Sequence, residues 1–247
     1  VLREDRSVLD LLSADYTLIV SAYVVATLFI GLALGKWLSQ NQIDSKLIST
    51  GTAICGGTAI ASLSPILRAS PEQTGTALGI VFILNALALI TFPYIGQWLD
   101  LSQAQFGVWT ALAIHDTSSV VATSILYGEE SGQIATAIKL GRTLWLVPVL
   151  LFFSFIEGSK ETKVRIPAFI FLFVGSSLTA SYLEIPADVI VLTSTLSKAL
   201  LVLALFLVGA STTRASLQNL NKKHLYQALI LWTSVVIVTL GFVHYSM

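Results

Sequence analysis

Charged side chains are scarce in this sequence. Asp, Glu, Lys and Arg make up 11% of its 247 residues, whereas hydrophobic residues make up 55%. A soluble domain carries about 25% charged residues, so this chain has too few to cover a water-facing surface. The mean hydropathy of +0.81 agrees with that shortage. We therefore expect a polytopic membrane protein.

The sequence also lacks the residues that several kinds of site require. Its one cysteine, Cys55, leaves no internal disulfide and no zinc-type spacing of Cys and His. The net charge is zero and there is no basic tail, so nucleic acid is not an expected partner. Gly56-Gly57 is not followed by Gly-Lys-Ser or Gly-Lys-Thr, so ATP is not the expected energy source within this chain. We expect no metal, no cofactor and no catalytic residue.

Long apolar runs take the place of charge. We expect about eight membrane segments, at residues 16–38, 46–69, 74–99, 106–127, 133–156, 166–183, 189–210 and 225–244. They predict an all-α fold with a single transmembrane transporter domain over residues 1–247. The chain begins with Val1 and its only methionine is Met247, so we expect the natural N-terminus and further helices upstream.

Two of these segments contain polar breaks at mid-membrane depth. Residues 51–61 hold three glycines and two threonines, and glycine costs about 1 kcal/mol at an interior helix position. Residues 113–119 include Asp116, whose carboxylate is unfavourable at that depth unless it is paired or faces water. We expect both segments to be discontinuous or re-entrant around a polar cavity. For the first segment, a tight helix-packing face of small residues is the alternative.

The two breaks can be aligned with each other. Residues 53–62 and 113–122 both start with Ala-Ile, continue through a polar or glycine break and end in small and β-branched residues. Secondary transporters often pair two interrupted segments from related repeats at the bilayer midplane. We therefore expect an inverted-repeat transporter fold that lacks its first helices.

Ionisable residues gather near the membrane centre. They are His115, Asp116, Lys139, Arg142 and Lys198. Lys139 and Arg142 are three residues apart and share a helix face, and snorkelling to the interface is the alternative to a place inside the bundle. Leaving out the histidine, three cations stand against one anion, and unpaired buried charges are unfavourable. This excess of positive charge predicts an anionic ligand.

The expected binding site adds donors from the two breaks to these charges. Backbone N–H groups and hydroxyls are available from Gly56, Gly57, Thr58, Thr117, Ser118 and Ser119. Helix N-termini at the breaks add partial positive charge. Arg142 is the expected bidentate contact to the anion, with Lys139 a point charge beside it. For Asn85, in segment 74–99, a helix–helix hydrogen bond is favoured over a ligand contact.

Three of the ionisable groups have two roles open to them. Asp116 is either a structural counter-ion to Lys139 or Arg142, or a coupling group that takes up and releases a proton or Na⁺. His115 titrates near neutrality and could carry a proton, or it is hydrogen-bonded to a helix backbone. Lys198 either keeps the empty site closed as a countercharge or pairs with Asp116.

Three blocks of the sequence resemble the hallmark blocks of the sulfate exporter family, bacterial inner-membrane proteins of largely uncharacterised function. The blocks are residues 51–61 (GTAICGGTAIA), 113–122 (AIHDTSSVVA) and 138–142 (IKLGR). The resemblance covers essentially the whole chain in order and spacing. It implies helices upstream and interrupted helices that meet at the membrane centre, as in the superfamily of cation/proton antiporters and anion transporters. Gly141 departs from the family, which often has a threonine or larger residue there.

The expected function is secondary active transport of a small inorganic or organic anion at the midplane of the bacterial inner membrane, coupled to H⁺ or Na⁺. The resemblance implies a sulfate-like oxyanion. One alternative is a cation/proton antiporter that uses Asp116 and a lysine. Another is an intramembrane enzyme with Cys55, Ser118 or Ser119 as nucleophile and His115 as base. The expected partners are the lipid bilayer, the anion and H⁺ or Na⁺, and a homodimer stays open.

Overall fold

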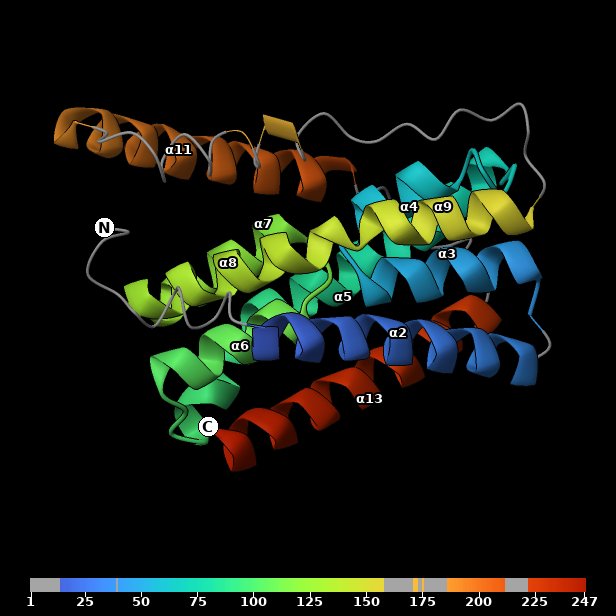
Figure 1. The fold of residues 1–247 in the computed structure, drawn as a ribbon, viewed down its shortest axis with the longest axis horizontal. Coiled ribbons are helices and arrows are strands. Elements are labelled where there is room, and N and C mark those ends of the chain that lie inside the picture. The colour runs from blue at the N-terminus through green and yellow to red at the C-terminus, as the bar shows by residue number, and fades with distance from the viewer. Residues whose placement is uncertain (1–13, 39, 158–170, 173–174, 176–185, 212–221) are drawn as a thin grey trace.

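The computed structural model describes residues 14–38, 40–157, 171–172, 175, 186–211 and 222–247. Within these residues every regular element is an α-helix, and most of the helices lie side by side in one bundle (Figure 1). The predicted all-α fold is thus confirmed for this part of the chain. The expected segment 166–183 falls almost entirely outside the described residues, so the expected number of eight segments stays a prediction.

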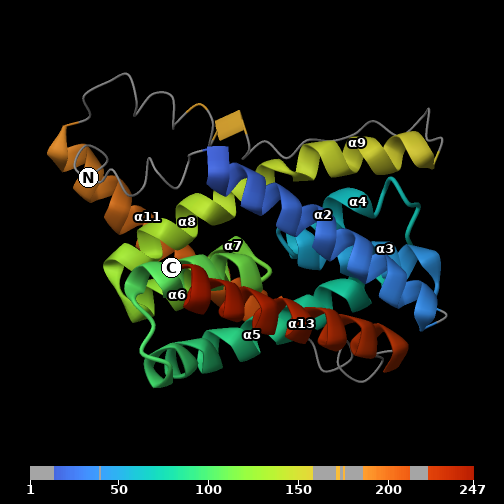
Figure 2. The same cartoon turned by 60° about the horizontal axis from the view of Figure 1, so that its bottom comes forward.

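Four helices of the described part are long and apolar enough to cross a membrane. They are α2 (Ala14–Trp37), α5 (Pro71–Trp98), the nearly continuous pair α8 (Glu129–Leu144) and α9 (Leu146–Ile156), and α13 (Lys222–Ser246). A further helix, α11 (Ala187–Ser211), lies along the edge of the bundle in both views of the ribbon (Figures 1 and 2). The chain is therefore a multi-pass membrane protein.

Between these spans the chain forms two helical hairpins. The first consists of α3 (Gln42–Ala53) and α4 (Gly57–Leu63), and the second of α6 (Gln103–Ala113) and α7 (Thr117–Tyr127). In the second, the Tyr127 hydroxyl at the end of α7 donates to the Leu101 carbonyl just before α6, at 2.6 Å. In the first, a Cβ atom on Gly51 of α3 would lie 2.9 Å from Ile60 Cδ1 of α4. Both interrupted segments are therefore discontinuous and turn back on themselves as helical hairpins.

The two hairpins enter the bundle from opposite ends. Lys46, near the start of α3, forms an ion pair with Glu157, which directly follows α9. Gln103, at the start of α6, accepts a hydrogen bond from the Glu130 backbone N–H in the first turn of α8, at 3.1 Å. Because α8 and α9 together run the length of one span, these contacts lie at its two ends. The hairpin tips consequently meet in the middle of the bundle.

Local sequence accounts for where the helices around the hairpins begin. Ser70 and Ser102 each start a capping box, with Gln73 and Gln105 as the returning side chains. Pro71 at the first position of α5 needs no N–H partner. These signals give sharp starts to α5 and α6, so the chain reverses direction within a few residues at each end of the bundle.

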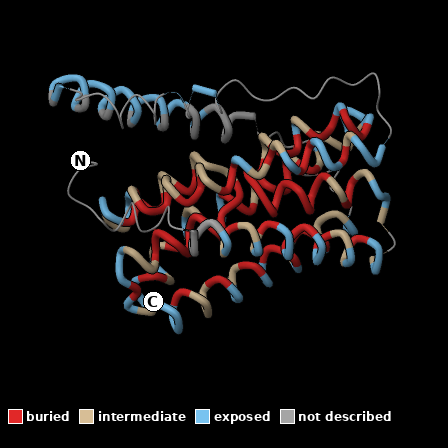
Figure 3. The backbone as a smooth tube through the Cα atoms, in the orientation of Figure 1, coloured by how far each residue is buried: buried red, intermediate tan, exposed pale blue. Residues whose placement is uncertain are grey.

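Buried residues concentrate along the middle of the bundle, while its outer faces stay exposed (Figure 3). Part of this core is a close three-helix contact at Gly31 of α2. A Cβ atom there would lie 2.5 Å from Ser49 Oγ of α3 and 2.9 Å from Leu231 Cδ2 of α13. The Gln227 amide of α13 also donates to the Gly31 carbonyl, at 2.8 Å. Glycine thus lets α2 approach both neighbours.

Replacing Gly31 with alanine is expected to lower the melting temperature in detergent, with a destabilisation of about 1–3 kcal/mol, because the added methyl group overlaps two neighbouring side chains. Gly141→Ala is the matched control: no atom lies within 4 Å of a Cβ at Gly141 of α8. The control should melt at the wild-type temperature or slightly above it. Equal effects of the two substitutions would contradict the close three-helix contact.

Candidate functional site

The two hairpin tips correspond residue for residue. The first helix of each hairpin ends at an alanine, Ala53 in α3 and Ala113 in α6, and the returning helices start at Gly57 and Thr117. These positions are equivalent in the alignment of residues 53–62 with residues 113–122. Each tip therefore consists of the same aligned stretch, residues 54–56 and residues 114–116.

The tips touch each other at Gly56. This residue has φ +59°, a left-handed conformation that glycine adopts without a steric penalty. A Cβ atom on Gly56 would lie 3.0 Å from His115 Cβ and 3.3 Å from the Asp116 backbone nitrogen. Gly56, an expected site residue, therefore allows both the turn and the close approach of the second tip.

Lys139 of α8 bridges the two tips. Its side chain is fully buried, and its Nζ donates to the Ile54 carbonyl at 3.2 Å and to the Ile114 carbonyl at 2.7 Å. These two residues are the C-caps of α3 and α6 and are equivalent in the alignment. One ammonium group thus serves the same position in both hairpins.

Arg142, one turn further along α8, binds the same two helix ends. Its Nε donates to the Ala53 carbonyl at 2.9 Å and its Nη2 to the Thr52 carbonyl, both in α3. Its Nη1 donates to the Ala111 and Leu112 carbonyls of α6, at 3.0 and 2.8 Å. The last carbonyls of a helix lack intrahelical partners and carry partial negative charge. Lys139 and Arg142 therefore cap the C-terminal ends of α3 and α6 together.

This geometry shows what the two cations bind. Lys139 and Arg142 lie inside the bundle, as expected, so the alternative of snorkelling to the interface is wrong. Arg142 donates four hydrogen bonds to backbone carbonyls, and its expected bidentate contact with a ligand stays a prediction. The excess positive charge at the centre is likewise offset by helix ends, which a count of charged side chains does not include.

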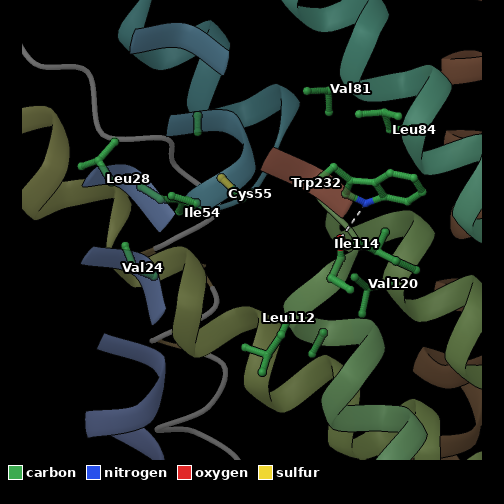
Figure 4. Close-up of a cluster of buried hydrophobic side chains, with 14 of the residues drawn as sticks. Val24, Leu28, Ile54, Cys55, Val81, Leu84, Leu112, Ile114, Val120 and Trp232 are labelled. Carbon is green, nitrogen blue, oxygen red and sulfur yellow. Dashed lines mark hydrogen bonds between the residues drawn. The ribbon is translucent and has the colours of Figure 1, made fainter. Parts of the chain in front are cut away.

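Two aromatic residues complete the capping of α6. The Tyr23 hydroxyl of α2 donates to the Leu112 carbonyl at 2.7 Å, and the Tyr23 ring lies 4.7 Å from the Arg142 guanidinium carbon. The Trp232 indole of α13 donates to the Ala113 carbonyl at 3.0 Å (Figure 4). Sequence reasoning missed both, since an aromatic residue in an apolar helix carries no signal for this role.

A chain of polar side chains links the second tip to the first hairpin. Asp116 Oδ2 accepts the Ser119 N–H at 3.0 Å as the N-cap of α7, and Oδ1 accepts from Asn85 Nδ2 of α5. Asn85 Oδ1 accepts the His115 backbone N–H and meets His115 Nδ1, both at 3.1 Å. Because an amide oxygen only accepts, Nδ1 carries the proton. The other ring nitrogen, Nε2, then accepts from the Thr52 hydroxyl, at 3.2 Å.

These contacts show what Asn85 and His115 bind, two residues for which the sequence left alternative roles open. Asn85 forms the expected helix–helix contact and also orients the Asp116 carboxylate. His115 is buried and bonds to two side chains, not to a helix backbone carbonyl. Among the ion pairs of the described residues, none includes Asp116. A direct ion pair of Asp116 with Lys139 or Arg142 is therefore absent from the described contacts.

A cavity of about 460 Å³ lies beside the tips, on the side where α4 and α7 begin. It is lined by Cys55, Gly57, Thr58, Ala61, Ser62, Leu78, Phe82, Asp116, Thr117 and Ser118. Five of the expected site residues therefore share its wall: Gly57, Thr58, Asp116, Thr117 and Ser118. Cys55, which directly precedes the glycine pair, and Ser62 of α4 were not expected there.

The remaining expected site residues whose side chains are described are not part of the cavity wall. Ser119 is buried and holds the Asp116 cap through its N–H. Lys198 belongs to α11, which contacts α7, and its side chain falls outside the described residues. Within the described residues no group of three His, Cys, Asp or Glu side chains is placed to hold a metal ion.

The chain was compared with known families and structures. A family model described as Conserved hypothetical protein 698 matches residues 9–228. No solved structure matches the chain.

Several bacterial proteins with the name UPF0324 membrane protein are similar to it. The protein from Porphyromonas gingivalis is 46% identical over 224 residues, which cover 89% of this chain and 68% of that protein. The protein from Bacteroides thetaiotaomicron is 43% identical over 228 residues, covering 90% and 68%. The protein from Shewanella oneidensis is 40% identical over 222 residues, covering 90% and 70%. These names report a membrane location and no activity, and together with the apolar helices they make the chain a multi-pass bacterial membrane protein.

Replacing Arg142 with methionine is expected to destabilise the protein by about 3–5 kcal/mol, because three buried carbonyls lose this donor and the Leu112 carbonyl keeps only the Tyr23 hydroxyl. Thermal unfolding in detergent, monitored by circular dichroism, measures the change. Lys46→Met is the control, since the partly exposed pair with Glu157 contributes about 0–1 kcal/mol. An Arg142→Met variant that melts like the wild type would contradict the capping role and favour a ligand-binding one.

Proposed function

The chain belongs to the family described as Conserved hypothetical protein 698, and we propose that it is a secondary active transporter of a small anion, coupled to H⁺ or Na⁺. The observation that carries this proposal is the cavity beside the two hairpin tips, whose wall includes Thr58, Asp116 and Ser118. Backbone outside regular structure is stable at membrane depth only where it is buried in protein or lines a cavity. Secondary transporters place substrate sites at such interrupted helices.

The distribution of helix ends favours an anion in this cavity. Lys139 and Arg142 occupy the negative ends of α3 and α6, on the far side of the tips. The first turn of α7 contributes the backbone N–H groups of Thr117 and Ser118, which lack intrahelical acceptors. Hydroxyls of Thr58, Ser62, Thr117 and Ser118 add further donors along the same wall. A small inorganic or organic oxyanion of the sulfate type matches this set of donors.

The opposite entry of the two hairpins supports an inverted-repeat architecture. Hairpins from opposite ends of the bundle meet at equivalent residues, which is the relation that an axis in the membrane plane produces. Movement of the tips relative to the neighbouring spans would then open the cavity to one side or to the other. A homodimer is compatible with this architecture but is not required by it.

A cation/proton antiporter is the second candidate, and Asp116 is the observation that favours it. Its carboxylate is part of the cavity wall, and carboxylates bind Na⁺ and protons. Catalysis is less well supported. Both ring nitrogens of His115 are engaged by Asn85 and Thr52, so the imidazole is not directed at Cys55, Ser118 or Ser119 as a base.

Cys55 provides a direct test, because it is the only cysteine of the sequence and lines the cavity. A bound anion is expected to slow the reaction of Cys55 with a small maleimide. The purified protein is labelled with and without sulfate, sulfite, thiosulfate, bicarbonate and short carboxylates, and the Cys55→Ser variant gives the background. Because sulfite and thiosulfate themselves add to maleimides, labelling rates are corrected for the measured concentration of free maleimide. Protection by Na⁺ or Li⁺ without protection by any anion would contradict the anion site and support the antiporter.

The hydroxyl of Thr117 is expected to contribute to that binding. Thr117→Val keeps the side-chain shape but removes one donor, so the concentration of anion that gives half-protection should rise about tenfold. Thr91→Val is the control, since the Thr91 hydroxyl bonds within its own helix to the Leu87 carbonyl, away from the cavity. The same shift in both variants would show that the effect does not come from the site.

A further inference from the structure

We propose that one proton enters with each anion and resides on Asp116, so that the protein is an anion–proton symporter. This inference rests on the proposed anion site and names its coupling ion. The argument starts from the position of the carboxylate. Asp116 lies in the cavity wall next to Thr117 and Ser118, and its Oδ2 already accepts the Ser119 N–H. When it is ionised, this side chain is an anion of the protein itself. It occupies the N-terminal end of α7, which is where the substrate anion would bind.

No neighbouring cation of the described residues is free to neutralise that carboxylate. The groups around it are Cys55 of the first tip, His115 of its own tip, Asn85 of α5, and Lys139 and Arg142 of α8. Both cations donate to helix-end carbonyls, while Asn85 is neutral and His115 is engaged on both ring nitrogens. Lys139 attracts Asp116 electrostatically but forms no ion pair with it.

A bound anion beside an ionised Asp116 would place two like charges next to each other in the cavity. Their repulsion opposes binding, so the empty site with a carboxylate binds anions weakly. A proton taken from the water on the side of entry removes the negative charge. On the other side of the membrane the anion leaves the cavity. Without a bound anion, nothing repels a carboxylate at this position, so the carboxyl group releases its proton to the water.

The hydrogen bonds indicate which oxygen receives the proton. Asn85 Nδ2 donates to Oδ1, so this oxygen stays an acceptor. The proton then resides on Oδ2, the oxygen that caps Ser119. As a neutral hydroxyl, Oδ2 accepts the Ser119 N–H less strongly and can donate its own proton to the anion. Protonation thus weakens the internal cap and adds one donor to the site.

Linkage between the proton and the anion can be measured by Cys55 protection with sulfate and thiosulfate, whose charges do not change between about pH 6 and about pH 8. Protection is taken as the ratio of labelling rates with and without anion at the same pH, which cancels the effect of pH on the thiol. If one proton binds with each anion, the half-protecting concentration rises about tenfold per pH unit where the empty site holds a carboxylate.

Asp116→Asn is the decisive variant. The single amide oxygen of asparagine can accept from Asn85, while its NH2 group takes the place of Oδ2 and leaves the Ser119 N–H without this acceptor. The loss of one cap is expected to leave the fold intact, as thermal unfolding will verify. Because the amide mimics the protonated acid, the variant should bind sulfate or thiosulfate equally well at all pH values. His224→Gln is the control, since it removes an imidazole that lies at Asp44, in another part of the bundle; it should keep the tenfold slope.

Several outcomes would overturn the inference while leaving the anion site intact. They are a pH-independent wild type, a pH slope that persists in Asp116→Asn, and protection that requires Na⁺ at every pH. Loss of the slope in Lys198→Gln would do the same, because it would make Lys198 of α11 the countercharge of Asp116. If none of the tested anions protects Cys55 at any pH in this range, the result would instead contradict the proposed function itself.

Discussion

Helix ends that lie inside a membrane have no water to bond their free carbonyls, and this constraint shapes the centre of the molecule. Two helices, α3 and α6, end there. Six hydrogen bonds from Lys139 and Arg142 satisfy those ends. The contact between the tips and the position of α8 against both hairpins follow from this arrangement. Fully buried cations are stable there because each finds several acceptors.

The same arrangement separates the charges into two groups. Lys139 and Arg142 are bound to the backbone on one side of the tips and contribute to the architecture. Asp116 belongs to the cavity wall instead, where Asn85 and the Ser119 N–H bond its carboxylate, and its change of charge is the proposal made above. A transporter needs both kinds of group: a rigid one that holds the broken helices and a variable one that responds to the ions it carries.

The sequence was sufficient to locate the breaks, to align them and to place Lys139 and Arg142 on one inward helix face. Its account of those cations left out their backbone partners. Counting side chains finds no partner for them, because the partners are backbone carbonyls that exist only once α3 and α6 end at the same place. The cavity contribution of Cys55 and the donors Tyr23 and Trp232 depend on the packing of distant helices. The membrane segment at residues 166–183 and the role of Lys198 remain predictions, because most of that segment and the Lys198 side chain lie outside the described part.

The position of α8 after both hairpins has a consequence for biosynthesis. The ribosome makes α3 and α6 before it makes Lys139 and Arg142, so the chain up to Tyr127 reaches the membrane with both helix ends uncapped. Neither hairpin can settle at mid-depth by itself without leaving carbonyls unsatisfied. Insertion of α8 is thus the step at which the two tips become stable, and the hairpins, although they enter from opposite sides, are completed together and late.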